Sequence, residues 1–234
     1  MATRVGYAEG VITGVPSVTT STSIAVAIGD GILIFGKYEN GFTLGGTISD
    51  SGAPDLSTYT ACFAETVHGG SQLRSRMWYG IATTAGTVTW TMTSTGSNYG
   101  FAGIYVFVCR PAGGTTFALG TGSAAPVFAT GTSTTPSAGS LTAGAAGAAF
   151  MGQCENNNGG AHTPNTGGGW TEESETEGEH QYLLVSGAGS ITGSCTMVNN
   201  VGWNAGMAFL QEQGSPIEDQ PETLHVIRSG IRLQ

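Results

Sequence analysis

The stretch GILIFGKYEN, residues 31–40, places four apolar residues in a row, from Ile32 to Phe35. A strand with one solvent-exposed face alternates apolar and polar residues, because successive side chains point to opposite faces. A continuous apolar run between turn residues instead indicates a strand that is covered on both faces or lies in a sandwich core. IYVFV, residues 104–108, is a second run of this kind. The two runs predict the centre of a β-sheet core.

The same stretch matches the G-x-x-x-x-G-K spacing of a phosphate-binding loop, with Tyr38 where serine or threonine would hold magnesium. The interior of such a loop is a flexible cradle of backbone N–H groups, whereas here it is Ile-Leu-Ile-Phe. The residues that follow signal a turn rather than the start of a helix. We therefore interpret GILIFGKY as a core strand and expect no nucleotide binding.

The rest of the chain is also typical of short strands joined by tight turns. In TVTWTMT, residues 87–93, Val88, Trp90 and Met92 alternate with threonines, as in a strand with one buried face. Glycine supplies 39 of the 234 residues, and no window of helical length shows a 3.6-residue period. We predict an all-β chain that folds as an antiparallel β-sandwich of jelly-roll or immunoglobulin-like type.

Two blocks of sequence recur and predict two pseudo-repeated halves. YGIATTAGTVTWTMT (79–93) matches YLLVSGAGSITGSCT (182–196) at an offset of 103, which also places Ala102-Gly103 on Ala205-Gly206. GILIFGKYEN matches GAAFMGQCEN (147–156) at an offset of 116. Two tandem sandwiches and one merged sandwich both fit these halves, and the short connector between them favours one merged unit.

The boundaries follow from these blocks. Residues 1–20 are predicted as an N-terminal arm, 21–119 as the first half and 140–213 as the second half. The connector, 120–139, is rich in Ser, Thr, Pro and Gly, and its VFAT segment can pair as an edge strand. Residues 214–234 end in the alternating LHVIRSGIRL and are predicted as a C-terminal arm, which either reaches a neighbouring subunit or closes an edge of its own sheet.

The charge balance excludes several classes of partner. The net charge is −9, Lys37 is the only lysine, and six arginines are scattered along the chain. Without a basic patch we expect neither nucleic-acid binding nor docking on an anionic membrane. No apolar run suits a signal peptide or a membrane span, which predicts synthesis in the cytoplasm without export.

The four cysteines, Cys62, Cys109, Cys154 and Cys195, never lie at C-x-x-C spacing. This pattern excludes a zinc knuckle. Disulfides Cys62–Cys109 and Cys154–Cys195 stay open as alternatives, although small reduced residues in strands are the simpler interpretation.

Clustered carboxylates raise the question of catalysis or metal binding. Asp50 and Asp55 lie at turn positions, where aspartate accepts hydrogen bonds from nearby backbone amides. In GGGWTEESETEGEHQYLL, residues 167–184, glutamates at 173, 175, 177 and 179 alternate with small polar residues. On one strand face they would repel one another, so we expect them to form a solvated edge. We predict no catalytic residue, no metal, no cofactor and no enzymatic activity.

The aromatic residues leave a second function open. Tyr79 and Trp90 alternate as core residues do, whereas Tyr99 in a turn-rich stretch and Trp170 after three glycines are predicted as exposed rings. Exposed rings can stack on sugars, so the aromatic residues leave glycan binding open as a function.

Several segments together resemble a group of β-sandwich proteins of tailed bacteriophages. They are SIAVAIGDGILIF (23–35), TISDSGAP (47–54), RMWYGIATTAGTVTWT (76–91), STTPSAGSLTAGAAGAAFMG (133–152) and WNAGMAFLQ (203–211). The resemblance covers about residues 20–212. It implies a structural virion protein of the head-decoration (cement) or head-fibre type, located on the capsid surface. It implies binding to the major capsid protein and to neighbouring copies as a homo-oligomer, and brings no catalytic residues.

Shell binding by such a protein is expected to rest on apolar anchors and on arginines in the arms. The candidate capsid-contact residues are Arg4, Val5, Tyr7, Ile227, Arg228, Ile231 and Arg232.

Overall fold

The structure is a computed structural model of the whole chain. It describes residues 1–13, 17–39, 47–52, 56–68, 73–93, 101–113, 115–155, 161–164, 168–174 and 178–214. Asp55, Tyr99 and the C-terminal arm with Ile227, Arg228, Ile231 and Arg232 lie outside these residues.

The first half forms two antiparallel sheets and a short strand pair. Its larger sheet, here the first inner sheet, has the order β1-β11-β4-β8-β6, with β7 also on β8. The first outer sheet has the order β2-β10-β5, and β3 pairs with β9. The strands are β1 (Thr3–Thr13), β2 (Ser17–Thr19), β3 (Ile24–Val26), β4 (Gly31–Tyr38), β5 (Ile48–Asp50), β6 (Thr60–Ala61), β7 (Thr66–Val67), β8 (Arg74–Ile81), β9 (Gly86–Val88), β10 (Trp90–Thr93) and β11 (Phe101–Arg110).

The second half also forms a larger and a smaller antiparallel sheet. The second inner sheet has the order β12-β20-β15-β18-β17, with β13 also on β20, and the second outer sheet has the order β14-β19-β16. The elements are β12 (Thr115–Leu119), the 3₁₀ turn η1 (Gly122–Ala124), β13 (Val127–Ser133), β14 (Ser137–Ala143), β15 (Gly147–Glu155), β16 (His162–Pro164), β17 (Thr171–Ser174), β18 (His180–Val185), β19 (Gly189–Met197) and β20 (Val201–Gly214).

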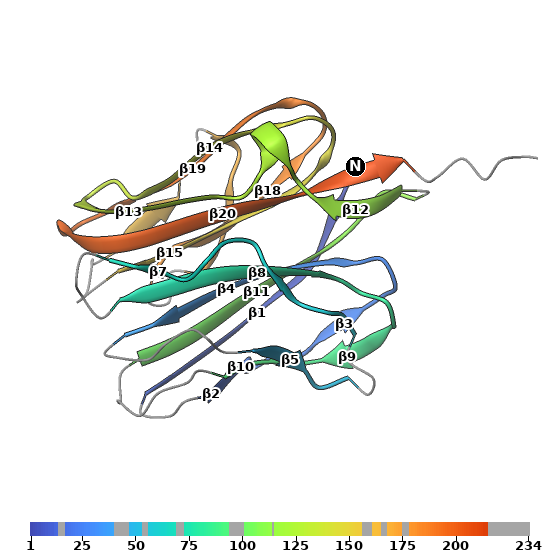
Figure 1. Ribbon diagram of the computed structural model, residues 1–234, viewed down its shortest axis with the longest axis horizontal. Coiled ribbons are helices and arrows are strands. Elements are labelled where there is room, and N and C mark those ends of the chain that lie inside the picture. The colour runs from blue at the N-terminus through green and yellow to red at the C-terminus, as the bar shows by residue number, and fades with distance from the viewer. Residues whose placement is uncertain are drawn as a thin grey trace, which may run out of the picture.

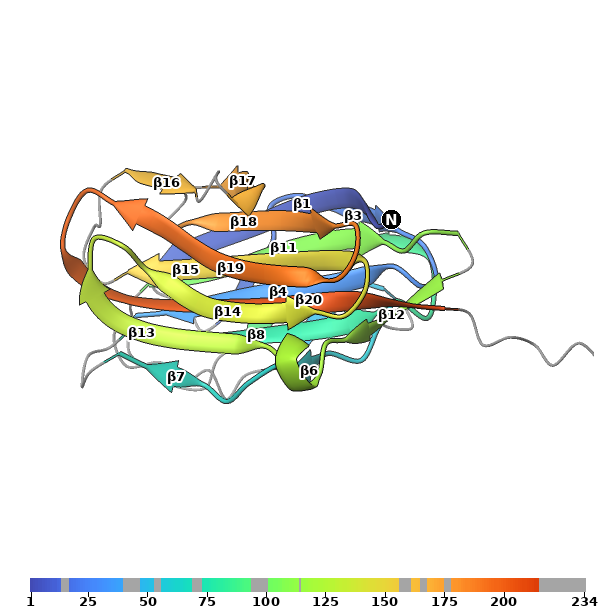
Figure 2. The same ribbon diagram turned by 90° about the horizontal axis from the view of Figure 1, so that it is seen from above.

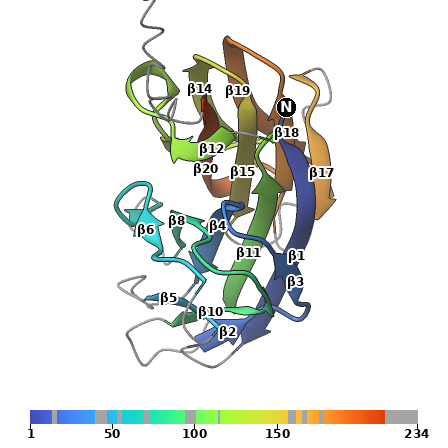
Figure 3. The same cartoon turned by 90° about the vertical axis from the view of Figure 1, so that its right-hand side faces the viewer.

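The four sheets stack as layers, with the two inner sheets face to face in the middle (Figures 1 and 3). Three apolar clusters separate the layers. The first core lies within the first half, and the second core lies within the second half. A third cluster, the shared core, contains residues of both halves, among them Phe35, Phe107, Phe150 and Leu210. The antiparallel all-β prediction is confirmed, and Figure 2 shows the layers from above.

Strand β4 explains why the opening stretch has no polar face. All eight of its residues are buried. Ile32 and Ile34 point into the first core, whereas Leu33 and Phe35 point into the shared core. The prediction of a strand covered on both faces is confirmed, and the same holds for β15, whose nine residues are all buried.

Each half has its own core and its own outer sheet. The molecule is therefore two sandwiches joined face to face by the shared core, rather than the single merged sandwich that the short connector favoured. The reason is that both inner sheets are apolar on both faces, so each needs a second layer as well as its own outer sheet.

The two halves follow one strand order, but the sequence matches differ in how they fit it. Tyr79 and Tyr182, matched at offset 103, both pack on the shared core. At offset 116, Gly36 and Gly152 face different cores: a Cβ on Gly36 would meet Met92, and one on Gly152 would meet Phe35. The pseudo-repeat and the jelly-roll classification stay predictions.

Several strands lie across the predicted boundaries. Residues predicted as an N-terminal arm form β1, the edge strand paired with β11 from Thr3 to Thr13. The predicted connector, 120–139, contributes β13 and the start of β14, and β12 of the predicted first half pairs with β20. The pairing of VFAT as an edge strand is confirmed, because Val127–Ser133 pair with β20.

The four cysteines are all free thiols, so neither alternative disulfide is present. Burial raises the pKa of the Cys154 thiol to about 12 and raises the pKa of the other three as well. Thiols held protonated in this way are poor nucleophiles and poor metal ligands.

The close approach of the inner sheets at Gly152 gives a direct test of the face-to-face stacking. A Cβ on Gly152 would lie 2.2 Å from the Phe35 ring, so alanine there must push the two sheets apart. We expect Gly152→Ala to lower the free energy of unfolding by about 1–3 kcal/mol, measured by urea denaturation.

The matched control is Gly187→Ala, because a Cβ there meets nothing within 4 Å. This control should leave the unfolding free energy unchanged or raise it by a few tenths of a kcal/mol. Equal stability of both variants would contradict the packing of Gly152 against Phe35.

Candidate functional site

The N-terminal candidate contacts are engaged inside the fold. Arg4 makes a two-pronged ion pair with Glu173 of β17, with 2.7 Å between Nη2 and Oε2, and lies over the Tyr182 ring. This hydrogen bonding to Glu173 raises the pKa of Arg4. Val5 packs on the first core, and Tyr7 packs on the shared core. Because β1 is an integral strand, Arg4, Val5 and Tyr7 do not form an extended arm. Their role in capsid contact stays a prediction.

The acidic stretch is less solvated than its alternation predicts. The Glu173 side chain is 7% exposed and paired with Arg4, and Glu179 is fully buried, whereas Glu172 is exposed. A register shift between Glu172 and Ser174 interrupts the strand alternation. The prediction of a solvated edge is therefore wrong for Glu173 and Glu179, while Glu175 and Glu177 lie outside the described residues.

The predicted exposure of Trp170 is also wrong. Its exposed fraction is 5%, it packs in the second core, and its Nε1–H donates to the carbonyl of Thr192 at 2.9 Å. The three preceding glycines suggested the tip of a loop. Trp170 instead directly precedes β17, and its ring is part of the second core. Asp50 behaves as predicted: its carboxylate accepts hydrogen bonds from the amides of Gly52 and Leu56 and from the Tyr59 hydroxyl.

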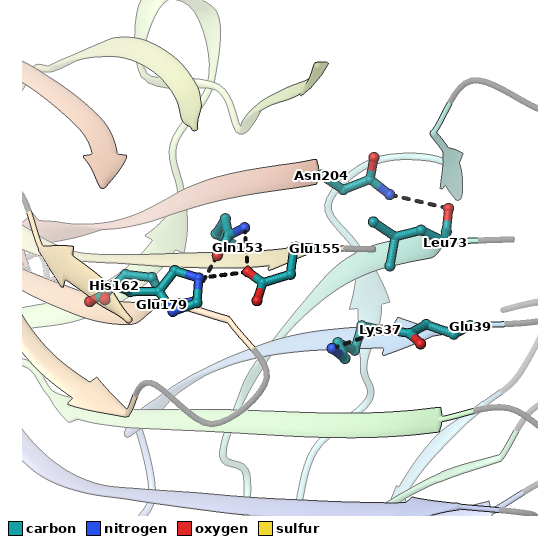
Figure 4. A network of polar contacts seen from close by, with 8 residues as sticks. All are labelled: Lys37, Glu39, Leu73, Gln153, Glu155, His162, Glu179 and Asn204. Atoms are coloured by element: carbon teal, nitrogen blue, oxygen red, sulfur yellow. Dashed lines mark hydrogen bonds and ion pairs between the residues drawn. The ribbon is translucent and has the colours of Figure 1, made fainter. Parts of the chain in front are cut away.

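Buried polar side chains gather at one end of the molecule, on both faces of the second inner sheet (Figure 4). We call this group the inter-sandwich polar cluster. Its members come from β4 and its end, from β15 and β16, from the start of β18 and from β20. They are Lys37, Glu39, Gln153, Glu155, His162, Glu179, His180 and Asn204.

Lys37, the only lysine, occupies the first inner sheet's side of this cluster. It continues the face of β4 that carries Leu33 and Phe35, and it is fully buried. Its ammonium lies 3.5 Å from the Glu39 carboxylate and 4.4 Å from the centre of the Phe101 ring. Taking an ammonium out of water is costly, so a carboxylate and an aromatic face are the partners expected around it.

The second inner sheet contributes a hydrogen-bonded set. His162 Nε2 lies 2.6 Å from Glu155 Oε2, which also accepts a hydrogen bond from Gln153 Nε2 at 3.3 Å. The backbone N–H of Glu179 donates to Gln153 Oε1 at 2.9 Å, and the N–H of Gln153 donates to the carbonyl of Glu179 at the same distance. These contacts fix the start of β18 against β15.

His180 spans the two sandwiches. Its ring stacks on Tyr105 of β11 with 3.5 Å between ring centres, and it lies 5.8 Å from the ring of Phe35. Burial, together with the nearby charge of Lys37 and the proximity of His162, holds the pKa of His180 well below its usual value, and a backbone contact at Ser174 opposes this only in part. Neutral His180 therefore packs as an aromatic side chain of the shared core.

Asn204 also makes a contact that crosses between the sandwiches. Its side-chain N–H group donates to the carbonyls of Leu73 and Thr66, at 3.4 and 3.5 Å. β20 of one sandwich is thereby tied to the chain on either side of the β7–β8 connection in the other.

The His162–Glu155 pair is of a type that moves protons in enzymes, but burial decides its role here. The side chains of His162 and Glu155 are 3% and 7% exposed, and Lys37, Glu179 and His180 are fully buried. Buried polar side chains of this kind pair with one another inside the protein. His180 and Asn204 are suited to holding the two inner sheets in register. The set of Gln153, Glu155 and His162 instead ties β15 to β16 and to the start of β18 within the second sandwich. Among the residues that the structure describes, no three His, Cys, Asp or Glu side chains gather to hold a metal ion.

Sequence reasoning missed this cluster. The one available signal was Lys37, a lysine at the same strand parity as Leu33 and Phe35 in a strand predicted to be covered on both faces.

Comparison of the chain with protein-family models, with curated proteins and with solved structures gave no match. In the described part of the chain, no helix has the length and apolar character to cross a membrane.

The lowered pKa of His180 predicts a loss of stability in mild acid. Below its ordinary value of about 6.5, the histidine binds a proton in the unfolded chain but not in the folded one, so the unfolding free energy falls as pH falls. The limiting contribution is about 1.4 kcal/mol per pH unit between pH about 6.5 and the folded pKa.

The measurement is urea denaturation of the wild type and of His180→Phe from pH 7 to pH 5.5. Phenylalanine keeps the stacking on Tyr105 but cannot titrate, so its profile should be flatter. Circular dichroism confirms that the variant folds. Parallel profiles would show that His180 does not carry this pH dependence.

Proposed function

We propose that this protein is a non-enzymatic structural component of a phage virion, a decoration protein that binds the major capsid protein and stabilises the head. The resemblance of residues 20–212 to phage β-sandwich proteins suggests the role. The fold is compatible with this role. Two sandwiches joined by a shared apolar core form a rigid unit, as a protein on a particle surface requires.

The observation that carries the proposal is the position of the two chain ends. The amino group of Met1 lies 3.8 Å from the Glu212 carboxylate, close to the end of β20 at Gly214. In Figure 1 the N-terminus lies beside the arrowhead of β20. The segment 215–234 therefore starts at one end of the body. We assign shell binding to Ile227, Arg228, Ile231 and Arg232 of this segment.

The alternative is a host-glycan-binding head-fibre or adhesin domain. Its aromatic basis is weaker than the sequence indicated, since Trp170 is buried and only Tyr99 remains as a candidate ring.

The proposed binding of the C-terminal segment to the capsid shell can be tested by replacing its apolar residues with aspartate. We expect the double variant Ile227→Asp and Ile231→Asp to lose at least tenfold in affinity for capsid shells of the source phage that lack this protein, since buried apolar anchors dominate such interfaces. Co-sedimentation with the shells measures the affinity, and the unfolding free energy should stay unchanged.

The control is Ile28→Asp, which replaces an isoleucine that is 71% exposed on the body. It should bind shells like the wild type. Undiminished binding by the double variant would overturn the assignment to the C-terminal segment, and absence of the protein from purified virions would overturn the virion role itself.

A further inference from the structure

A small hollow lies beside η1, where β12 leads into β13, next to the end of β20. Figure 1 shows where these elements lie in the fold. Its volume is about 190 Å³. The polar side chains that line it are three hydroxyls and two amides, from Thr121, Ser123, Thr142, Gln211 and Gln213. The other lining residues are glycines, Leu119 and Ala124, so the hollow carries no charged side chain.

Backbone hydrogen bonds of residues 120–124 hold one wall of the hollow in place. The N–H of Gly120 donates to the carbonyl of Phe209, and the N–H of Ala124 donates to the carbonyl of Thr121. A Cβ on Gly120 would lie 2.3 Å from the Ala124 carbonyl oxygen, so only glycine permits this tight return of the chain. Ser123 Oγ donates to the carbonyl of Thr142 at 3.5 Å, a long hydrogen bond that links the turn to β14.

Thr142, which lines the hollow, also belongs to an exposed surface of serine and threonine side chains on β14 and β19. Thr142 and Ser140 of β14 lie opposite Ser190 and Thr192 of β19, and all four are exposed. The hydroxyls of Ser140 and Thr192 lie 2.7 Å apart. Threonine has few rotamers, so covering such a face costs little side-chain entropy. The hollow thus opens next to a flat, uncharged, hydroxyl-bearing surface.

We propose that this hollow binds one neutral sugar unit, with the neighbouring hydroxyl face as the path for the rest of a neutral oligosaccharide. Amides and hydroxyls donate and accept hydrogen bonds without charge, which matches the hydroxyl groups of a sugar. The volume is below the roughly 300–1,000 Å³ of drug-sized ligand sites, so it suits a single ring. A chain with net charge −9 disfavours an acidic sugar. The site goes beyond the capsid role and does not rest on it.

The test is a titration of the full-length, ¹⁵N-labelled protein with methyl glycosides of glucose, galactose and N-acetylglucosamine, followed by NMR. At least one should give saturable shifts with a dissociation constant of about 10 mM or tighter. The shifts should involve the side-chain amides of Gln211 and Gln213 and the backbone N–H groups of residues 120–124. N-acetylneuraminic acid, which is charged, should bind at least tenfold more weakly.

Two variants locate the site. Gln211→Leu and Thr142→Val should each weaken binding several-fold, because each removes a hydrogen-bonding group from the hollow. Thr196→Val, at an exposed position of β19 outside the hollow, is the matched control and should bind like the wild type.

Three outcomes would overturn the proposal. They are no saturable shift with any of the three neutral sugars, shifts confined to residues elsewhere, and equal binding of the acidic sugar. None of these bears on shell binding, which is measured separately by co-sedimentation.

Discussion

The face-to-face burial of the two inner sheets is the constraint on which the rest of the structure depends. β4 and β15 have no solvent-facing side, so each must be covered by an outer sheet and by the other inner sheet. An apolar strand of this kind cannot end a sandwich without exposing a large apolar surface. The two halves are therefore joined by packing, and the order of layers follows from which faces are apolar.

The inter-sandwich polar cluster gives this joint a defined register. Apolar faces alone tolerate sliding, whereas buried donors and acceptors must meet particular partners. His180 stacks on Tyr105, and Asn204 donates to Leu73, across the joint. A shift of one sheet against the other would break both contacts. Replacing such groups by apolar ones is often neutral or stabilising in other proteins, so we interpret the cluster as specifying the arrangement rather than as adding stability.

Sequence reasoning reached the features that are local and failed on those that join distant segments. The run from Ile32 to Phe35 predicted a doubly covered strand because burial on both faces leaves no polar position. Asp50 was predicted correctly because its partners Gly52 and Leu56 lie within six residues.

The failures have one physical cause. Arg4 and Glu173 are 169 residues apart, and only the stacking of β1 next to β17 brings them together. Trp170 was assigned to the surface from its flanking glycines, although the second outer sheet covers it. A pattern within one segment cannot show which other segment will cover it.

The positions of the lysine and arginine side chains link the fold to the proposed function. All five lysine and arginine side chains of the described residues are engaged within the molecule. Arg4 pairs with Glu173, Lys37 with Glu39, Arg74 with Glu65 and Arg110 with Asp30, while Arg76 lies over the Trp78 ring. Of the chain's six arginines, Arg228 and Arg232 remain. A partner with acidic groups would therefore find its arginines in the C-terminal segment, next to the apolar residues Ile227 and Ile231.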